Sequence, residues 1–391
     1  MTPGTRHHQG MMRSAVALVL LAGLACGCSE GISDPGVMPN DLKFPDPATS
    51  KLDPAKAAQL QAVLTKVTSI PDTEAGSRGV TAAVVSDKWV WSGAAGKDAA
   101  GTTLTPQTSM GVASITKTFV AAEVMLLVKD KKVDLNAPLS RYVKHKLTEN
   151  GATVWQHLSM RSGVPNYLPD DYARMDKVIK AAPGKHFTPE EALSYDTAQP
   201  VQPDVYSYSN INYILLGLLI EKETGEKLGT VLRRDLATPA GLEHASFQDG
   251  EKPAPPLAED RNPVCGQAVD GFTPCRAVAS LSMANAGLAA DAPTIARWGY
   301  QLYGGRVVPN EQVDQMITGD GEYGLGTMFF SQTFGSGTAY GHRGEMPDYT
   351  SLFIVIPEHK VAVSIILADG NKHVDTVMTD FVAALQPLLA G

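Results

Sequence analysis

The sequence predicts an α+β fold: an antiparallel sheet flanked by helices, built from both chain ends, with an all-α domain inserted between them. Paired apolar runs joined by short polar turns lie near each end, at 79–93 and 351–367. Strands joined by such hairpins pair antiparallel. The stretch 118–289 contains little that alternates like a strand, and helical spacing dominates it. We therefore assign 51–117 and 290–391 to the sheet domain and 118–289 to the helical domain.

The first 27 residues are expected to be an export signal. An arginine precedes the apolar run Ala15–Ala25, which is too short to span a bilayer. The run leads to Cys28, and this ending resembles the lipobox of bacterial lipoproteins, where the cysteine becomes the lipidated first residue. Lipidation at Cys26 and plain secretion are the alternatives. The mature chain would be periplasmic or on the cell surface, held to the membrane only by a lipid anchor, with the proline-rich residues 28–50 as an extended tether.

The first elements of the sheet domain follow this tether. Asp53, followed by a proline, is expected to cap a helix whose apolar residues recur at helical spacing up to Val67. Gly79–Val85 is predicted to be a buried strand, Ser86–Lys88 its turn, and Trp89–Gly93 the returning strand.

The rest of the chain is predicted as a series of helices that ends in a second strand pair. Further predicted helices are Thr118–Val128, Leu147–Gly163, Pro189–Leu193, Tyr213–Thr224, Leu228–Leu236, Thr294–Tyr303 and His373–Leu389. The second strand pair is predicted at Ser351–Ile356 and Val361–Leu367.

Composition narrows the function classes. The chain has 391 residues, 43% of them hydrophobic, and a formal net charge of −8. No Lys/Arg-rich run occurs, and neutralising nucleic-acid phosphates requires a basic surface, so nucleic-acid binding is disfavoured. No cofactor is implied.

Cys265 and Cys275 are predicted to form a disulfide, because pairing is the default for two cysteines in an exported protein. A zinc site is the competing interpretation, but a second Cys/His pair at ligand spacing is missing from the sequence. No metal site is therefore predicted.

Ser114 and Lys117 are candidates for a catalytic pair. They lie three residues apart at the start of an apolar helix, so their side chains share one face. A serine hydroxyl is a weak nucleophile until a base takes its proton, and a desolvated lysine can be that base. Free N–H groups at the helix start favour negative charge developing there. Matches to so short a motif also occur by chance.

Tyr208 and Asn210 form the only Tyr-x-Asn in the chain and precede a predicted helix. A tyrosine beside a cationic lysine has its phenolate favoured, so Tyr208 can shuttle protons. An asparagine offers a donor and an acceptor, so Asn210 can position an amide substrate. The alternative is a capping asparagine beside a packed tyrosine.

The segment Gly341–Glu345 precedes the C-terminal strand pair. A glycine such as Gly344 lets a substrate lie against the strand edge, and the N–H of Glu345 can point at an oxyanion. His342 adds a hydrogen-bond donor and a partial positive charge. A surface histidine in a glycine-rich turn is the alternative.

In this order, Ser-x-x-Lys, Tyr-x-Asn and His-x-Gly resemble the motifs of the penicillin-recognising serine hydrolases. These include class C β-lactamases, D-alanyl-D-alanine carboxypeptidases and related carboxylesterases. The resemblance runs from about Gly79 to the last strand and includes the landmarks 153–163 and 208–217. It implies a β-lactamase/transpeptidase-like fold.

The resemblance also implies roles for individual residues. Ser114 would be the acylated nucleophile, Lys117 its proton partner, and Tyr208 the general base and acid. Asn210 would contact the substrate amide. The backbone N–H groups of Ser114 and Glu345 would form the oxyanion hole, as in other acyl-transfer enzymes.

The strand motif departs from the Lys-Thr-Gly of most β-lactamases. His342 stands for the basic residue, and Arg343 replaces the threonine that helps to hold a substrate carboxylate. Arg343 is expected either to restore that grip with a bidentate contact or to crowd the groove. The Glu345 carboxylate is unfavourable beside an oxyanion unless its side chain points outward.

The sequence thus predicts an exported serine hydrolase that forms an acyl-enzyme and acts on D-Ala-D-Ala peptides or β-lactams. A small-ester carboxylesterase is one alternative. A penicillin- or peptidoglycan-binding receptor with little turnover is the other. In each case the expected partner is a small molecule or a fragment of peptidoglycan.

Overall fold

The structure is a computed structural model of the chain. It describes residues 43–70, 77–260, 263–266, 271–319, 323–335, 337–370 and 373–389. The predicted export signal, Cys28 and most of the predicted tether lie outside the described residues. Within the described part of the chain, no helix is both long and apolar enough to cross a membrane.

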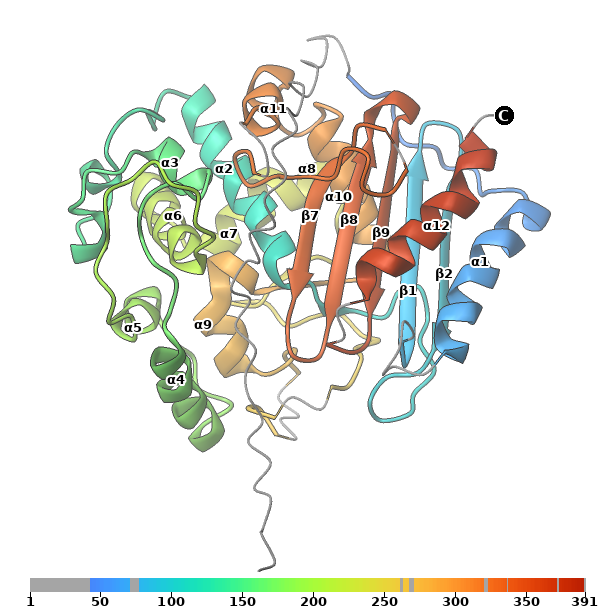
Figure 1. Cartoon of the computed structure of the whole chain (residues 1–391), viewed down its shortest axis with the longest axis horizontal. Coiled ribbons are helices and arrows are strands. Elements are labelled where there is room, and N and C mark those ends of the chain that lie inside the picture. Colours follow the sequence, from blue (N-terminus) through green and yellow to red (C-terminus); the bar gives the residue numbers. More distant parts are fainter. Residues whose placement is uncertain are drawn as a thin grey trace, which may run out of the picture. The chain divides into compact units, whose positions relative to one another are not determined.

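A six-stranded antiparallel sheet organises the fold (Figure 1). Its strands are β1 Gly79–Ser86, β2 Val90–Gly96, β6 Met328–Phe329, β7 Tyr340–Glu345, β8 Thr350–Ile356 and β9 Val361–Leu367. They lie in the order β2-β1-β9-β8-β7-β6. Val80 of β1 pairs with Leu367 of β9, so the N-terminal and C-terminal hairpins join in one sheet. The predicted α+β class and the assembly of the sheet from both chain ends are confirmed.

Helices cover both faces of this sheet. α1 (Pro54–Ser69) and α12 (Val374–Leu389) pack on one face, and α10 (Ala292–Tyr303) packs on the other (Figure 1). Strand residues alternate between two cores, with Val84 on the α1 and α12 side and Ala83 on the α10 side. Because both faces are covered, β1, β8 and β9 are buried along their whole lengths.

The core on the α10 side continues into the helical part of the chain without interruption. The helices there are α2 Thr116–Lys129, α3 Val154–Leu158, α4 Pro169–Ala181, α5 Pro189–Ser194, α6 Asn210–Thr224, α7 Leu228–Leu232, α8 Thr238–Ala240, α9 Arg276–Ala286 and, later, α11 Asn310–Met316. A small sheet, not predicted from the sequence, joins the two parts through β3 Met110–Gly111, β4 Ser246–Phe247 and β5 Leu288–Ala290.

The single helix predicted over Leu147–Gly163 is wrong. The structure has one 3₁₀ turn at Lys146–Thr148 and then the short α3. Gly151 between them has φ +80°, a left-handed conformation that ends a helix. Thr153 then caps α3 with its hydroxyl, which starts a new helix rather than continuing the old one.

The sequence analysis missed the short helices α8 and α11 and two longer ones, α4 and α9. α4 begins at Pro169 in a stretch rich in proline and aspartate, whose composition resembles that of the flanking loops. α9 consists mainly of Ala, Ser and Met, so its apolar and polar faces differ little. The weak contrast removes the periodic signal on which a helix prediction depends.

The chain from residue 43 onward already lies on the sheet domain. Phe44 is buried against the ring of Tyr300, with the ring centroids 5.0 Å apart. Its N–H donates to Gly304 C=O at 2.9 Å. The described end of the segment assigned to a tether, residues 43–50, is therefore anchored to α10 and to its neighbour β1, where Ser86 C=O accepts from Ala48 N–H at 2.9 Å.

Candidate active site

Ser114 lies in the 3₁₀ turn η1 (Ala113–Ile115), which runs directly into α2. The preceding Ala113 has φ +48°, an unfavourable conformation for a residue with a Cβ. Thr116 braces this turn, because its hydroxyl donates to Ala113 C=O at 2.7 Å and accepts from Leu288 N–H at 3.1 Å. Ser114 thus stands half-buried on a strained turn that neighbouring elements hold in place.

Gly344 of β7 allows this turn to approach the sheet. A Cβ at Gly344 would lie 2.2 Å from Val112 O and 3.1 Å from Ala113 Cβ. Ser351 of β8 donates to the same Val112 oxygen at 2.9 Å. The sequence analysis expected Gly344 to make room for a substrate at the strand edge, but protein atoms fill the space beside this glycine. The glycine is needed for the contact between β7 and η1.

Lys117 points its amine at three acceptors. Nζ lies 2.8 Å from Ser114 Oγ, 2.8 Å from Asn210 Oδ1 and 2.8 Å from Asn285 C=O. Asn285 belongs to the last turn of α9, where carbonyl groups lack a partner inside the helix. The two carbonyl oxygens can only accept hydrogen bonds. They therefore occupy two of the three hydrogen-bonding directions of the amine, and the third direction points to Ser114 Oγ.

The protonation state of Lys117 follows from its burial. The side chain is fully buried, and this desolvation lowers its pKa well below the usual value of 10.5. A neutral amine has two N–H groups and one lone pair. With both N–H groups on the carbonyls of Asn210 and Asn285, the lone pair faces the hydroxyl of Ser114. Lys117 is therefore arranged to take the proton of Ser114.

Tyr208 lies half-buried above the same amine, with its ring centroid 5.1 Å from Lys117 Nζ. Burial raises the pKa of Tyr208 strongly, and a hydrogen bond with Ser114 only partly opposes this effect. The sequence analysis expected a phenolate favoured by a cationic lysine. The structure differs, because burial disfavours the charged form of both groups, and it favours a neutral phenol beside a neutral amine.

Asn210 opens α6, and its side chain is already engaged. Oδ1 accepts from Lys117, and the backbone N–H donates to Asn166 Oδ1 at 3.1 Å. The hydroxyl of Tyr172 on α4 is hydrogen-bonded to the side chains of both Asn210 and Asn166. The acceptor that the sequence analysis offered to a substrate amide thus serves Lys117. The sequence analysis missed Asn166, Tyr172 and Asn285.

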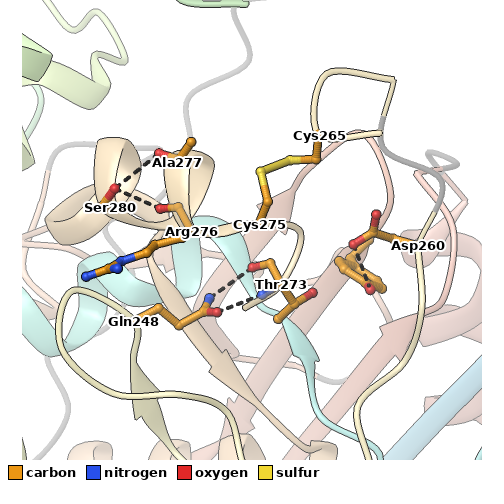
Figure 2. Close-up of a disulfide and its surroundings, with 9 residues drawn as sticks. Gln248, Asp260, Cys265, Thr273, Cys275, Arg276, Ala277 and Ser280 are labelled. Atoms are coloured by element: carbon orange, nitrogen blue, oxygen red, sulfur yellow. Dashed lines mark hydrogen bonds between the residues drawn. A yellow bond between two sulfur atoms is a disulfide. The ribbon is translucent and has the colours of Figure 1, made fainter. Parts of the chain in front are cut away.

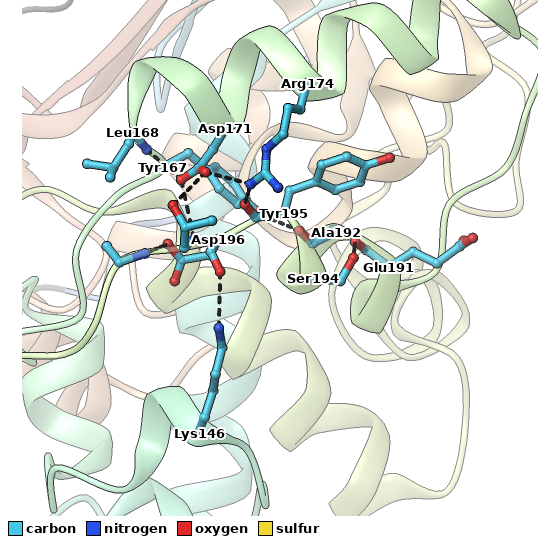
Figure 3. Close-up of polar contacts among 12 residues, drawn as sticks. Lys146, Tyr167, Leu168, Asp171, Arg174, Glu191, Ala192, Ser194, Tyr195 and Asp196 are labelled. Carbon is cyan, nitrogen blue, oxygen red and sulfur yellow. Dashed lines mark hydrogen bonds and ion pairs between the residues drawn. The ribbon is translucent and has the colours of Figure 1, made fainter.

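A buried carboxylate fixes the start of α4, which carries Tyr172 (Figure 3). Asp171 accepts from Leu168 N–H at 2.9 Å and from the Thr197 hydroxyl at 2.8 Å, and it forms an ion pair with Arg174. These bonds tie the first turn of α4 to the loop that follows α5. Tyr172 is held near Asn210 by this anchor.

The loop that carries Tyr208 runs beside the turn 160–163. Val201 N–H donates to Gly163 C=O at 2.9 Å, and Ser207 N–H donates to Met160 C=O at 2.8 Å. Gly163 has φ +71°, and a Cβ there would lie 2.3 Å from Val201 O. Beneath them, Asn212 of α6 accepts from Ser162 Oγ at 2.6 Å. The two sequence landmarks, 153–163 and 208–217, therefore form one structural unit that places Tyr208 and Asn210.

His342 is completely buried and does not carry the expected positive charge. Burial and then the nearby Lys117 lower the pKa of His342 to about 3. Its Nδ1 lies 2.6 Å from Arg343 C=O, and its Nε2 lies 3.0 Å from the hydroxyl of Tyr323. Both ring nitrogens already have partners within the protein. The sequence analysis placed His342 at the substrate and missed Tyr323.

Arg343 points away from Ser114. Its guanidinium forms an ion pair with Asp375 in the first turn of α12. Side chains alternate along a strand, and cross-strand partners share a face. Arg343 pairs with Leu352, which belongs to the core on the α12 side, whereas His342 pairs with Phe353 in the core on the α10 side. Arg343 therefore neither grips a carboxylate in the groove nor crowds it, and both expectations for it are wrong.

The backbone of Glu345 is oriented as an oxyanion donor requires. Met346 N–H donates to Tyr349 C=O at 2.9 Å, so in the alternating ladder the next pair, Glu345 and Thr350, is not hydrogen-bonded. The N–H of Glu345 therefore points away from β8. It lies on the opposite edge of β7, where β6 pairs with the first two residues of the strand, Tyr340 and Gly341. The exposed carboxylate shares the face of Arg343, which is the outward orientation that the sequence analysis required.

The predicted disulfide between Cys265 and Cys275 is confirmed (Figure 2). Cys275 precedes the first residue of α9, and the opposite end of α9 supplies the Asn285 carbonyl. Gln248 holds the segment just before Cys275 in place. Its side chain accepts a hydrogen bond from Thr273 N–H at 2.8 Å and donates one to Thr273 C=O at 2.9 Å. Among the described residues, no group of three or more His, Cys, Asp or Glu side chains is arranged to hold a metal.

Comparisons with known proteins found relatives in sequence and in fold. A family model described as Beta-lactamase matches residues 57–386. Protein flp of Staphylococcus aureus (strain N315) is 27% identical over 182 residues, which are 43% of this chain and 33% of that protein. Unguisins hydrolase ungD' of Aspergillus campestris (strain IBT 28561) is 27% identical over 201 residues, 46% of this chain and 36% of that protein. The chain therefore spans about a third of the length of these relatives.

Solved structures share the fold at low sequence identity. D-amino acid amidase from Ochrobactrum anthropi SV3, complexed with L-phenylalanine amide, has a TM-score of 0.72 and 21% identity, covering 85% of this chain and 99% of that one. D-stereospecific amidohydrolase from Streptomyces sp. has a TM-score of 0.70 and 21% identity, covering 84% and 99%. The octameric penicillin-binding protein homologue from Pyrococcus abyssi has a TM-score of 0.67 and 23% identity, covering 84% and 77%.

Proposed function

The chain belongs to the beta-lactamase family, and from this premise we propose that it is a serine hydrolase that cleaves small amides and peptides through an acyl-enzyme on Ser114. One observation carries the proposal. The amine of Lys117 is buried, bound to two carbonyl oxygens, and 2.8 Å from Ser114 Oγ. A base held in this way can activate a serine hydroxyl.

The proposed reaction uses neutral groups at the start. Ser114 Oγ attacks the substrate carbonyl, and its proton passes to Lys117 Nζ. The N–H groups of Ser114 and Glu345 stabilise the resulting oxyanion. The C–N bond breaks as the Tyr208 hydroxyl gives its proton to the leaving nitrogen, and the proton on Lys117 replaces it. Tyr208 therefore donates a proton without becoming a stable phenolate, consistent with the burial that raises its pKa.

Water completes the cycle by attacking the acyl ester on Ser114. The proton of the water passes through Tyr208 to Lys117, and Lys117 returns this proton to Ser114 Oγ as that oxygen leaves the carbonyl. The complete set of Ser114, Lys117 and Tyr208 favours this turnover over a receptor that only binds.

For the substrate we propose amides and peptides that contain a D-residue and lack a carboxylate near the scissile bond. D-Ala-D-Ala ends and β-lactams, expected from the sequence, carry a carboxylate that this family holds at the strand motif. Here the Arg343 guanidinium lies on the α12 side of the sheet, and His342 is buried and neutral. Support for D-amides comes from the fold shared with a D-amino acid amidase and a D-stereospecific amidohydrolase.

Small neutral esters are the second candidate substrates. The same orientation of Arg343 favours them, because an ester has no carboxylate that needs a cationic partner. An alkoxide also leaves with less help from a proton donor than an amine does. The distinction between amide and ester therefore depends on how strongly turnover requires Tyr208.

We also propose that the mature protein is exported and lipid-anchored at Cys28. The apolar run that leads to this cysteine supports export. The disulfide between Cys265 and Cys275 fits an oxidising compartment. Mass spectrometry of the protein from bacterial membranes should find diacylglyceryl-modified Cys28 as the first residue. An unmodified N-terminus at another position would contradict the anchor.

A substrate panel on the chain without its predicted export signal tests the proposed reaction. The panel contains a D-amino acid p-nitroanilide, its L-isomer, a D-Ala-D-Ala peptide, a chromogenic cephalosporin and a short p-nitrophenyl ester. We expect the D-anilide and the ester to be turned over faster than the two carboxylate substrates. Faster turnover of the cephalosporin or the D-Ala-D-Ala peptide would overturn the substrate class while leaving the acyl-enzyme reaction in place.

A further inference from the structure

Tyr323 lies in a cluster of aromatic side chains beside Lys117. It is buried, and its ring meets Tyr208 edge to face, with centroids 6.0 Å apart and an interplanar angle of 87°. Its hydroxyl oxygen lies near that of Tyr213, whose own proton goes to Leu158 C=O at 3.0 Å. Lys117 Nζ lies 5.1 Å from the centroid of Tyr208 and 5.7 Å from that of Tyr213. Tyr323 therefore contacts both rings that flank the proposed base.

His342 holds Tyr323 from the other side. Arg343 C=O can only accept, so His342 Nδ1, 2.6 Å away, carries the ring proton. His342 Nε2 then carries a lone pair and accepts a hydrogen bond from the Tyr323 hydroxyl at 3.0 Å. The two rings also meet edge to face at 5.7 Å. A backbone carbonyl thereby sets the tautomer of His342, and the tautomer sets the direction of the bond from Tyr323.

We propose that Tyr323, held by His342, is a positioning residue that keeps the rings of Tyr208 and Tyr213 in place around Lys117. The proposal rests on the proposed function, because it assigns Tyr323 a part in the acylation of Ser114. Tyr323 does not touch the reacting atoms and acts through Tyr208.

The proton route explains why this support matters. Lys117 has three fixed polar partners, whereas Tyr208 comes from a loop and is held by its hydrogen bond with Ser114 and by the contacts of its ring with Lys117 and Tyr323. Proton transfer between Lys117 and Tyr208 depends steeply on the position of the hydroxyl. Without the bond to His342, the Tyr323 ring can shift, and the ring of Tyr208 loses the surface that orients it.

The chain offers a matched control in Tyr303. It is buried to the same extent as Tyr323, at 3% exposure, and its hydroxyl shares a hydrogen bond of 2.9 Å with Thr327. Its ring packs on Tyr340 and Phe353 in the same core. Tyr303→Phe therefore removes a comparable buried hydroxyl without disturbing the partners of Tyr208.

The test measures the rate of acylation by a fluorophosphonate, kcat and KM on the preferred amide, and the Tm of each variant. We expect Tyr323→Phe to slow acylation and kcat about 5- to 10-fold, the scale of one hydrogen bond, with KM unchanged. His342→Leu should cause the same loss, and the double variant should lose little more. His342→Gln, which keeps an acceptor for Tyr323, should recover to within about 2-fold of the wild type.

Tyr303→Phe should lower Tm by as much as Tyr323→Phe but acylate at the wild-type rate. Wild-type acylation in Tyr323→Phe, or equal slowing in Tyr303→Phe, would overturn the positioning role. If Tyr323→Phe fails to fold, the pair His342→Gln and His342→Leu decides, and equal rates for the two would reject the proposal. Labelling of the wild type is measured before any variant. A wild type that is not labelled at Ser114 would reject the proposed function rather than the positioning role.

Discussion

The two sides of the candidate active site differ in how they obtain their geometry. On the helix side, Ser114 and Lys117 lie one turn apart, and their side chains meet at 2.8 Å. On the strand side, His342, Arg343 and Glu345 follow one another along β7, yet their side chains go to opposite faces of the sheet. His342 enters the core, and Arg343 reaches α12. Spacing alone therefore determines contact on the helix but not on the strand.

The difference has a simple physical origin. On a helix, residues three apart share a face whatever surrounds the helix. On a strand, the period of two fixes only which residues share a face, and the packing of the whole sheet decides which face lies toward Ser114. That decision depends on α10 and α12, far away in the sequence.

Removal of the Lys117 amine should have the largest effect on the helix side. Lys117→Met keeps the buried apolar stem but removes the base, so we expect kcat/KM to fall by at least about 10²-fold. Lys129→Met, at the exposed end of the same helix, is the control and should keep wild-type activity. A loss of less than tenfold in Lys117→Met would show that another group takes the proton of Ser114.

The strand side should be broken most severely at Gly344. A Cβ there would lie 2.2 Å from a backbone oxygen, so Gly344→Ala must push β7 away from the turn that carries Ser114. Overpacking of this kind costs about 1–3 kcal/mol of unfolding free energy, and we expect at least a tenfold loss of kcat. Gly184→Ala, where no atom lies within 4 Å, should change neither quantity. Normal activity in Gly344→Ala would contradict the close contact.

Lys117 should also leave a signature in pH titrations. Burial lowers its pKa, so acylation should rise with pH through that lowered value and then level off. Between the lowered pKa and 10.5, the unfolded chain binds more protons than the folded one, so the free energy of unfolding should rise with pH by up to about 1.4 kcal/mol per unit. Denaturant titrations should show this slope in the wild type and not in Lys117→Met.

Arg343 should have the smallest effect of the residues compared. Its ion pair with Asp375 is a third exposed, and such pairs contribute about 0–1 kcal/mol. Arg343→Ala should therefore change kcat/KM by less than about 2-fold on carboxylate and neutral substrates alike. A selective loss of 10-fold or more on carboxylate substrates would mean that the guanidinium turns into the groove when a substrate binds.

The sequence was sufficient for four strands of the six-stranded sheet, for the disulfide and for the contact between Lys117 and Ser114, because each has a short-range pattern. Apolar runs joined by short polar turns predicted β1, β2, β8 and β9, and the pairing of Cys265 with Cys275 followed from the default expected of two cysteines in an exported protein. The partners that hold the Lys117 amine could not be predicted from the sequence. Asn285 contributes a backbone carbonyl at the end of a helix with weak periodicity, and a backbone carbonyl has no sequence signature.

Tyr323 and Tyr172 were missed for a related reason. Each acts through contacts between segments that are far apart in the sequence, β7 with Tyr323 and α6 with Tyr172. A lone tyrosine is more often a core residue than a functional one. The neutral states of Lys117 and His342 also depend on burial, which the motifs alone did not indicate.

Covalent labelling of Ser114 tests the central claim most directly. The wild-type chain without its predicted export signal is treated with a fluorophosphonate at neutral pH, and the adduct is located by tandem mass spectrometry. We expect one adduct per chain, on Ser114, because its hydroxyl faces the lone pair of Lys117. Ser114→Ala should remain folded and unlabelled, and an adduct that persists on another residue of this variant would contradict the assignment.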